Sequence, residues 1–224
     1  MNWDIPFRDR MHAGQTLVAA LAAWRGQADV LVLALPRGGV PVAYEIASAL
    51  ALRLDLMLVR KLGTPGHKEM AMGAIASGGV QVLNEDVIHY LNISPATIDA
   101  AMHEEVLELQ RRDQAYRGER PTPALAGQQV ILVDDGLATG ATMRAAIAAV
   151  RRQAPARIIV AVPVAPAETL AMLRPLVDQL ICPLTPEPFF AIGQCYRDFA
   201  QTTDEEVKTL LSQAWQRELG DAAP

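Results

Sequence analysis

Two adjacent acids, Asp134 and Asp135, directly follow a run of four apolar residues, Val130–Val133. An apolar run without a polar break is typical of a strand buried on both faces of a parallel sheet. Ligands of such sheets bind beyond the carboxyl ends of the strands, so both acids are expected at a binding edge. Carboxylates there suit a ligand that presents hydroxyl groups or a hydrated divalent cation.

The next segment, residues 136–142, is rich in glycine, threonine and alanine and leads into a predicted helix, Thr142–Arg151. Gly140 removes side-chain bulk, and Thr139 and Thr142 add hydroxyl donors. The backbone N–H groups at the start of the helix would form an anion cradle that the helix dipole reinforces. Because acids beside this cradle would repel a bare phosphate, the pattern favours a ligand with hydroxyls next to its phosphate, such as ribose 5-phosphate.

The whole segment resembles the phosphoribosyl pyrophosphate (PRPP) motif of type I phosphoribosyltransferases, which is an apolar strand, two acids and a Thr-Gly-x-Thr loop. The resemblance implies that Asp134 and Asp135 hold the ribose 2- and 3-hydroxyls. It also implies a 5-phosphate loop made of Ala138, Thr139, Gly140, Ala141 and Thr142. The alternative is an ordinary strand–turn–helix unit in which an aspartate caps the helix.

A second loop, Pro36-Arg37-Gly38-Gly39, lies between a predicted strand, Val30–Leu35, and a predicted helix, Val40–Leu52. Its glycines let the backbone approach an anion closely, and Arg37 offers a forked donor suited to phosphate. It resembles the family's pyrophosphate loop, in which a strained, often cis, non-proline peptide exposes an amide. By that resemblance the Arg37–Gly38 bond is the candidate. The alternative is a tight turn with a surface arginine.

Arg60 and Lys61 are expected to end a second strand, Leu54–Val59, on the same carboxyl edge as Arg37 and Asp134. Cations that converge there would suit a ligand with a pyrophosphate group. The resemblance implies a basic residue in contact with pyrophosphate at this place, and Lys61 is the predicted one. The alternative is a pair of solvated charges at a strand end.

A polar stretch that contains glycine, Arg60–Gly73, follows. The segment Leu62–Ala76 is long for a connection and its glycines permit backbone swings, so we expect a lid. By resemblance this lid closes over PRPP, and His67 or Lys68 donates to the departing pyrophosphate. The alternative is a polar surface loop in which neither side chain has a role.

Strands alternate with helices along most of the chain, which predicts an α/β fold with a parallel sheet flanked by helices. We expect one domain: a type I phosphoribosyltransferase-like core over residues 29–182 and, by resemblance, a small hood from residues 1–28 and 183–224 over the acceptor site. The other predicted elements are a hairpin (Ala74–Ala76 with Val80–Leu83), a helix from Ser94 and Pro95 to about Tyr116, strands at Arg157–Val162 and Gln179–Cys182, and helices at Glu168–Leu173 and Thr203–Leu219.

The composition excludes several classes of protein. The formal net charge of -5 gives no electrostatic footprint for nucleic acid. No apolar run approaches the roughly 20 residues that span a bilayer, and the first ten residues lack the apolar core of a signal peptide. We therefore expect a cytoplasmic protein without a membrane partner, in which Cys182 and Cys195 are reduced thiols.

The resemblance implies transfer of a phosphoribosyl group from PRPP to a nitrogenous acceptor, such as a nucleobase, with release of pyrophosphate. Catalysis then consists mostly of charge placement around an oxocarbenium-like transition state. Asp134 and Asp135 would favour the developing positive charge, while Arg37, Lys61 and Lys68 would neutralise the leaving group together with Mg²⁺. The PRPP oxygens and hydroxyls would carry that ion, since no histidine lies at a spacing that suggests a protein metal cage.

The acceptor is not defined by these motifs. Enzymes for hypoxanthine and guanine usually place an aspartate where this chain has Ala138, and the loop is locally similar to that of the adenine enzymes. The aromatic residues Phe189, Phe190, Tyr196 and Phe199 are expected to anchor the C-terminal segment, with stacking on a planar base as the alternative. Two other functions stay open: a PRPP- or nucleotide-binding regulator without turnover, and a phosphate-dependent nucleotide phosphorylase. The sequence does not define the oligomeric state; dimers are common in the family, which makes a homodimer one candidate.

Overall fold

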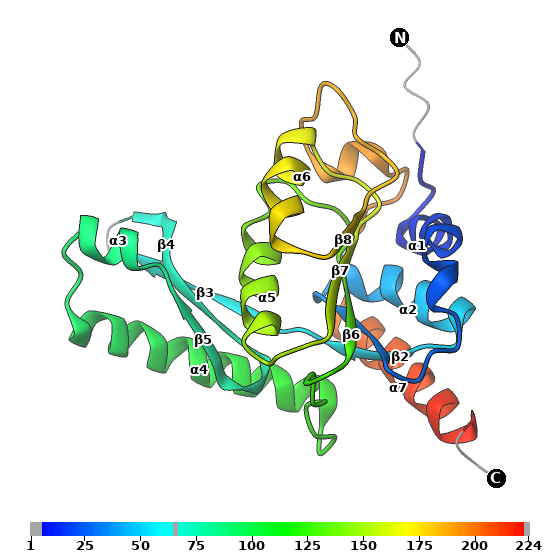
Figure 1. Ribbon diagram of the computed structural model, residues 1–224, viewed down its shortest axis with the longest axis horizontal. Coiled ribbons are helices and arrows are strands. Elements are labelled where there is room, and N and C mark those ends of the chain that lie inside the picture. The colour runs from blue at the N-terminus through cyan, green and yellow to red at the C-terminus, as the bar shows by residue number, and fades with distance from the viewer. Residues whose placement is uncertain (1–5, 65–66, 222–224) are drawn as a thin grey trace.

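A computed structural model describes residues 6–64 and 67–221 and contains a five-stranded, all-parallel sheet. Its strand order is β2-β1-β6-β7-β8, with helices on both faces (Figure 1). This is the α/β architecture that the alternation of strands and helices predicts. The strands are β1 (Val30–Ala34), β2 (Arg53–Leu56), β6 (Gln129–Val133), β7 (Arg157–Ala161) and β8 (Gln179–Ile181).

Alternate residues of β1 show how the sheet organises two cores. Val30 and Val32 face one hydrophobic cluster, and Leu31 and Leu33 face the other, because successive side chains of a strand point to opposite faces. All four are almost fully buried. The helices on the first face are α1 (Arg10–Val18), α2 (Gly39–Leu50) and α7 (Asp204–Asp221); those on the second are α5 (Ala141–Arg151) and α6 (Ala167–Leu173).

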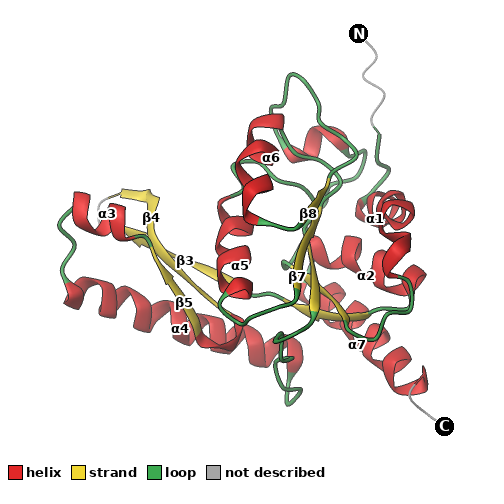
Figure 2. Ribbon diagram, in the orientation of Figure 1, coloured by secondary structure: helices red, strands yellow, loops and turns green. Residues whose placement is uncertain are grey.

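A second, antiparallel sheet of three strands forms an arm that extends from the main body (Figure 2). Helix α4 packs along this arm with Ile98 and Met102 against Leu62 and Met72. The side chains of Asn84 and Ser94 cap the two helices of the arm, and the predicted helix start at Ser94 and Pro95 is confirmed. The arm consists of β3 (Val59–Thr64), β4 (His67–Ala76), β5 (Val80–Leu83), α3 (Glu85–Tyr90) and α4 (Pro95–Arg117).

The arm corrects two predictions. A single second strand, Leu54–Val59, is wrong, because β2 ends at Leu56 in the main sheet and Val59 begins β3 in the other sheet. The polar stretch Arg60–Gly73 is mostly strand rather than loop: Leu62 pairs with Gly73, and Lys61 pairs with Ala74. Buried Leu62 and Met72 alternate with polar or small residues, and this period-2 pattern is masked in the sequence by the intervening glycines.

The N- and C-terminal segments lie together. Phe7 forms a bridge with Tyr196, and its ring packs 5.2 Å from the tyrosine ring. Helix α7 begins after Thr203, whose hydroxyl accepts from the N–H of Glu206 and so caps the helix. Helix α7 packs in the main-sheet core, where Val207 and Leu211 are fully buried. Among the described residues, no helix has both the length and the apolar character needed to cross a membrane.

A buried ion pair connects the arm to the main sheet. The guanidinium of Arg117, at the end of α4, donates to Asp55 on β2 over 2.7 Å and also to the carbonyl of Leu56. The Arg117 side chain is fully buried, and Asp113 also accepts from it. Burial raises the pKa of Asp55, and Arg117 opposes that rise. Removing Arg117 would therefore leave Asp55 in the interior without its hydrogen-bonded partner, opposite the partly exposed Arg120 at 3.9 Å.

We expect Arg117→Leu to lower the free energy of unfolding by about 3–5 kcal/mol, because Asp55 would lose its buried partner. Arg111→Leu on the same helix is the matched control, since the Arg111 side chain is 66 % exposed and pairs with Glu108 across the helix surface. Urea unfolding measures both variants. Equal stability losses in the two variants would contradict a structural role for the buried pair.

Candidate functional site

The two acids lie where β6 ends. Asp135 is buried and Asp134 is partly buried, and Asp134 Oδ1 accepts the backbone N–H of Asp135 at 2.9 Å. Strand β6 pairs with β1 on one side and β7 on the other, so the acids occupy the middle of the sheet's carboxyl edge. The sequence places them at this edge, and the structure confirms that position.

The Pro36–Gly39 loop packs directly on these acids, because β1 and β6 are neighbours and both end here. A Cβ atom on Gly38 would lie 2.0 Å from Asp135 Oδ2, and a Cβ atom on Gly39 would lie 2.7 Å from the carbonyl oxygen of Val133. Neither gap accepts a methyl group. Both glycines are therefore required by the close approach of the loop to the strand end, which also presses the loop against the carboxylate.

The non-proline cis peptide of this loop is Pro36–Arg37, so the predicted Arg37–Gly38 bond is wrong by one position. The Arg37 side chain extends toward the start of α7, where its Nη1 lies 3.7 Å from Asp204 Oδ1. Among the described residues, no ion pair joins Arg37 to Asp134 or Asp135. The structure thus brings the backbone of the loop to the acids and directs its guanidinium elsewhere.

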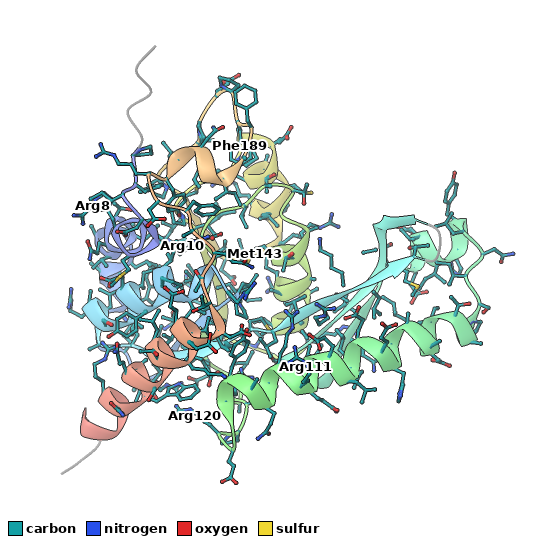
Figure 3. The ribbon with its side chains drawn as sticks, turned by 180° about the vertical axis from the view of Figure 1, so that it is seen from behind. Arg8, Arg10, Arg111, Arg120, Met143 and Phe189 are labelled. Atoms are coloured by element: carbon teal, nitrogen blue, oxygen red, sulfur yellow. The ribbon has the colours of Figure 1, made fainter. Side chains whose placement is uncertain are left out.

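Arg10 is a site residue that the sequence analysis missed. Its Nε lies 2.7 Å from Asp135 Oδ2, and its Nη1 donates to the carbonyl of Ala200 at 2.6 Å. The guanidinium also lies 3.9 Å above the centre of the Phe199 ring. Figure 3 labels Arg10 where α1 meets the C-terminal segment. No local pattern could reveal this contact, since 125 residues separate Arg10 from Asp135.

An aromatic cluster closes the same side of the site. The Tyr196 hydroxyl donates to the backbone carbonyl of Asp135 at 2.6 Å, and its ring packs against Phe7 and Phe199. Phe189 packs on this cluster, while Phe190 is 80 % exposed. The expected anchoring role is confirmed for Phe189, Tyr196 and Phe199, which attach the C-terminal segment to the strand end.

Burial dominates the electrostatics of the acid pair. It raises the pKa of both carboxyls, and the neighbouring charge of Asp135 raises the pKa of Asp134 further. The hydrogen bond and charge of Arg10 act in the opposite direction on Asp135. Burial also raises the pKa of Tyr196, which keeps its hydroxyl a donor. Asp135 therefore has a counter-ion within hydrogen-bonding distance, whereas Asp134 is stabilised mainly by a backbone N–H.

The loop after the acids leads into the N-terminus of α5. Gly140 adopts φ +69°, and a Cβ atom there would lie 2.8 Å from Thr169 Cγ2, so only glycine suits this position. Thr169 fixes the loop by donating to the carbonyl of Ala138 at 2.6 Å. The first turn of α5 has no acid, and its N-cap residue, Gly140, has no side chain to cap it; the Thr139 hydroxyl accepts the N–H of Ala141 at 3.5 Å. Free N–H groups and the positive end of the helix dipole therefore lie beside the acids.

Within the described residues, the backbone N–H groups of Ala138, Thr139 and Gly140 donate to no protein acceptor. Ala138 and Thr139 are exposed, and so is Thr142 in the first turn of the helix. This arrangement has the donors and the solvent access that a bound anion requires.

The lysines predicted to contact pyrophosphate belong to the arm and not to the carboxyl edge of the main sheet. Lys61 does not end a strand of the main sheet; it is an exposed residue of β3 in the arm. Its neighbour Arg60 pairs with Glu105 of α4 at 2.6 Å. The backbone of Lys68 belongs to β4, but its side chain and that of His67 lie outside the described part of the structure. The described residues also contain no group of three or more His, Cys, Asp or Glu side chains that could hold a metal ion.

Comparison with known proteins agrees with this geometry. The model of the phosphoribosyl transferase domain family matches residues 9–198. A Mycobacterium tuberculosis protein, named provisionally as a phosphoribosyl transferase, is 45 % identical over 208 residues, which cover 93 % of this chain and 47 % of that protein. The chain thus spans about half the length of the curated relatives it matches. A crystal structure of a Thermus thermophilus protein is 42 % identical, with a TM-score of 0.83, over 92 % of this chain and 98 % of that one.

Asp134→Asn should stabilise the fold at neutral pH. A raised pKa means that the folded chain binds the Asp134 proton more tightly than the unfolded chain, so the ionised carboxylate costs stability at pH 7. The asparagine can still accept the Asp135 N–H without that charge. We expect a gain on the order of 1 kcal/mol at pH 7, which shrinks as the pH falls through the raised pKa toward the ordinary value near 3.8.

Urea unfolding from about pH 4, near the ordinary aspartate pKa, to about pH 7 measures this difference. Asp99→Asn, at an exposed position on α4, is the control and should show no such pH-dependent gain. An Asp134→Asn variant that is less stable than the parent at neutral pH would contradict the electrostatic description of the acid pair.

Proposed function

The chain belongs to the phosphoribosyl transferase domain family, and from that premise we propose that it transfers the ribose 5-phosphate group of PRPP to a nitrogenous acceptor and releases pyrophosphate. The packing of the Gly38–Gly39 loop on Asp134 and Asp135, next to the start of α5, is the observation that carries this proposal. PRPP presents hydroxyls, a 5-phosphate and a pyrophosphate, and this edge of the sheet offers a suitable partner for each.

The ribose hydroxyls would donate to the acids. Asp135 uses Oδ2 for Arg10, so its contact with ribose would be made through Oδ1. Arg10 holds this carboxylate in place and balances one of the two negative charges. One uncompensated carboxylate, Asp134, then remains near the reacting carbon. Such a charge favours the positive charge that develops on the ribose in an oxocarbenium-like transition state.

The 5-phosphate would bind at the start of α5. Its partners would be the free N–H groups of Ala138, Thr139 and Gly140, the helical amides of Ala141 and Thr142, and the two threonine hydroxyls. The hydrogen bond from Thr169 to the Ala138 carbonyl holds the loop in this shape before the ligand arrives. A loop fixed in advance loses less conformational entropy on binding.

The pyrophosphate would lie against the backbone of the Arg37–Gly39 loop, with Lys61 and Lys68 supplied by the arm. Strands β3 and β4, rather than an irregular lid, would bring these cations to the leaving group. Mg²⁺ fits this donor set as an ion carried by PRPP, because oxygen atoms are the ligands it prefers and it usually keeps several waters. When bound, it would neutralise the charge of the leaving pyrophosphate.

The acceptor would bind beneath the terminal segments that carry Arg10 and the aromatic cluster, which are the segments predicted to form the hood. We propose a nitrogenous acceptor such as a nucleobase, because an amine or ring nitrogen can attack the ribose carbon as pyrophosphate leaves. Ala138 provides no acid–base group for a 6-oxopurine, which disfavours hypoxanthine and guanine.

Asp135→Asn should weaken PRPP binding about 10- to 100-fold, because a charged acceptor for a ribose hydroxyl and the counter-ion of Arg10 are lost together. Pyrophosphate release from PRPP and Mg²⁺, with purines, pyrimidines and other amines as acceptors, measures the effect on turnover. Asp99→Asn is the matched control, and thermal unfolding establishes that each variant is folded.

Unchanged PRPP affinity in a folded Asp135→Asn protein would refute the site assignment. PRPP binding without pyrophosphate release for any acceptor would instead identify a regulator that lacks turnover. Base release from a nucleotide that depends on inorganic phosphate would identify a phosphorylase.

A further inference from the structure

A small cavity lies between α4, the start of α7 and the Pro36–Gly39 loop. Its volume is about 140 Å³, several times the roughly 30 Å³ that a water molecule occupies in the liquid. The lining comes from three segments that are far apart in the sequence: Arg37; Arg111, Arg112, Ala115 and Tyr116; and Asp204. Figure 3 labels Arg111 on α4 near the main body, where this cavity is formed.

The three guanidinium groups at this cavity have two carboxylates as hydrogen-bond or ion-pair acceptors. Arg111 and Arg112 both donate to one carboxylate, that of Glu108, and Arg37 lies 3.7 Å from Asp204. Each guanidinium has five N–H donors, so two carboxylates leave most of these donors without a charged partner. Counting Glu108, which lies outside the cavity lining, the group carries three positive and two negative charges.

The acidic and phenolic groups of this region are fixed by hydrogen bonds. The Tyr116 hydroxyl donates to Asp204 Oδ1 at 2.6 Å, and burial together with Asp204 raises the pKa of Tyr116 to about 12. Hydrogen bonds from Arg111 and Arg112 lower the pKa of Glu108 to about 2. Asp204 Oδ1 therefore already accepts from a neutral donor, and Arg37 Nη1, at 3.7 Å from the same oxygen, lies beyond hydrogen-bonding distance, so its N–H groups are available to another anion.

We propose that this cavity is an oxyanion site that binds a phosphoryl group through Arg37, Arg111 and Arg112. Planar guanidinium groups bind phosphate oxygens in pairs, and three of them around one cavity suit a tetrahedral anion. The site is separate from the loop at the start of α5, because none of its residues belongs to that loop. Its existence does not rest on the proposed transfer reaction, although Arg37 also belongs to the loop that packs on the acids.

The test is equilibrium dialysis of the protein at low ionic strength and without PRPP. Inorganic phosphate is the ligand in one experiment and pyrophosphate in a second. The double variant Arg111→Gln/Arg112→Gln should lose one bound anion per chain, or bind it about tenfold more weakly. The matched control is Arg151→Gln/Arg152→Gln, which removes the same charge from two adjacent exposed arginines at the end of α5. The control should bind as the parent does.

A second variant blocks the cavity without a change of charge. Ala115→Met places a longer side chain at an exposed position of α4 that lines the cavity, and methionine is well tolerated in helices. It should also lose the bound anion. Loss of phosphate binding or of pyrophosphate binding in both variants supports the site. The anion whose binding is lost is the one that the cavity takes.

Binding of both anions that is the same in the parent, the two variants and the control would overturn the proposal. So would the absence of anion binding beyond the α5 site in the parent protein. Neither result bears on PRPP binding at Asp135, because no PRPP is present in the dialysis.

Discussion

The site depends on one steric constraint: neither Gly38 nor Gly39 has room for a Cβ atom. These residues lie against Asp135 and against the end of β6 because β1 and β6 are paired neighbours that end together. Any side chain at Gly38 would displace the carboxylate that Arg10 holds. One close approach of two backbones thus fixes the loop, the acid and, through Arg10, the contact between the two terminal segments.

The same close packing has an electrostatic cost. Two adjacent carboxylates are taken out of water, and only Asp135 has an arginine within hydrogen-bonding distance. Asp55 differs from Asp134 in this respect: it is also buried, but it accepts a hydrogen bond from Arg117. An acid that stays incompletely compensated in a well-packed protein is a candidate functional group, because such a charge persists where binding or chemistry requires it.

Local sequence patterns predict much of the fold. The features that they do not predict depend on contacts between residues far apart in the chain. The apolar run Val130–Val133, the acids and the glycines of the two loops predict the parallel sheet and its carboxyl edge. The sequence could not reveal Arg10, whose partner is 125 residues away, nor the direction of the Arg37 side chain. The predicted hairpin of Ala74–Ala76 with Val80–Leu83 is confirmed. Strand β3 and the part of β4 before Ala74 are not predicted, because glycines and polar residues conceal an alternation that packing against α4 explains.

Calorimetric titration with PRPP and Mg²⁺ of the parent protein, Gly38→Ala and Gly63→Ala tests most directly whether PRPP binding depends on the contact between Gly38 and Asp135. The parent should bind one PRPP per chain, and Gly38→Ala should lose this binding because its methyl group displaces the Asp135 carboxylate. Gly63→Ala should bind as the parent does, since nothing lies within 4 Å of a Cβ atom at that position. A folded parent protein that does not bind PRPP, or a Gly38→Ala variant that binds it normally, would contradict a PRPP site at Asp135 that depends on this contact.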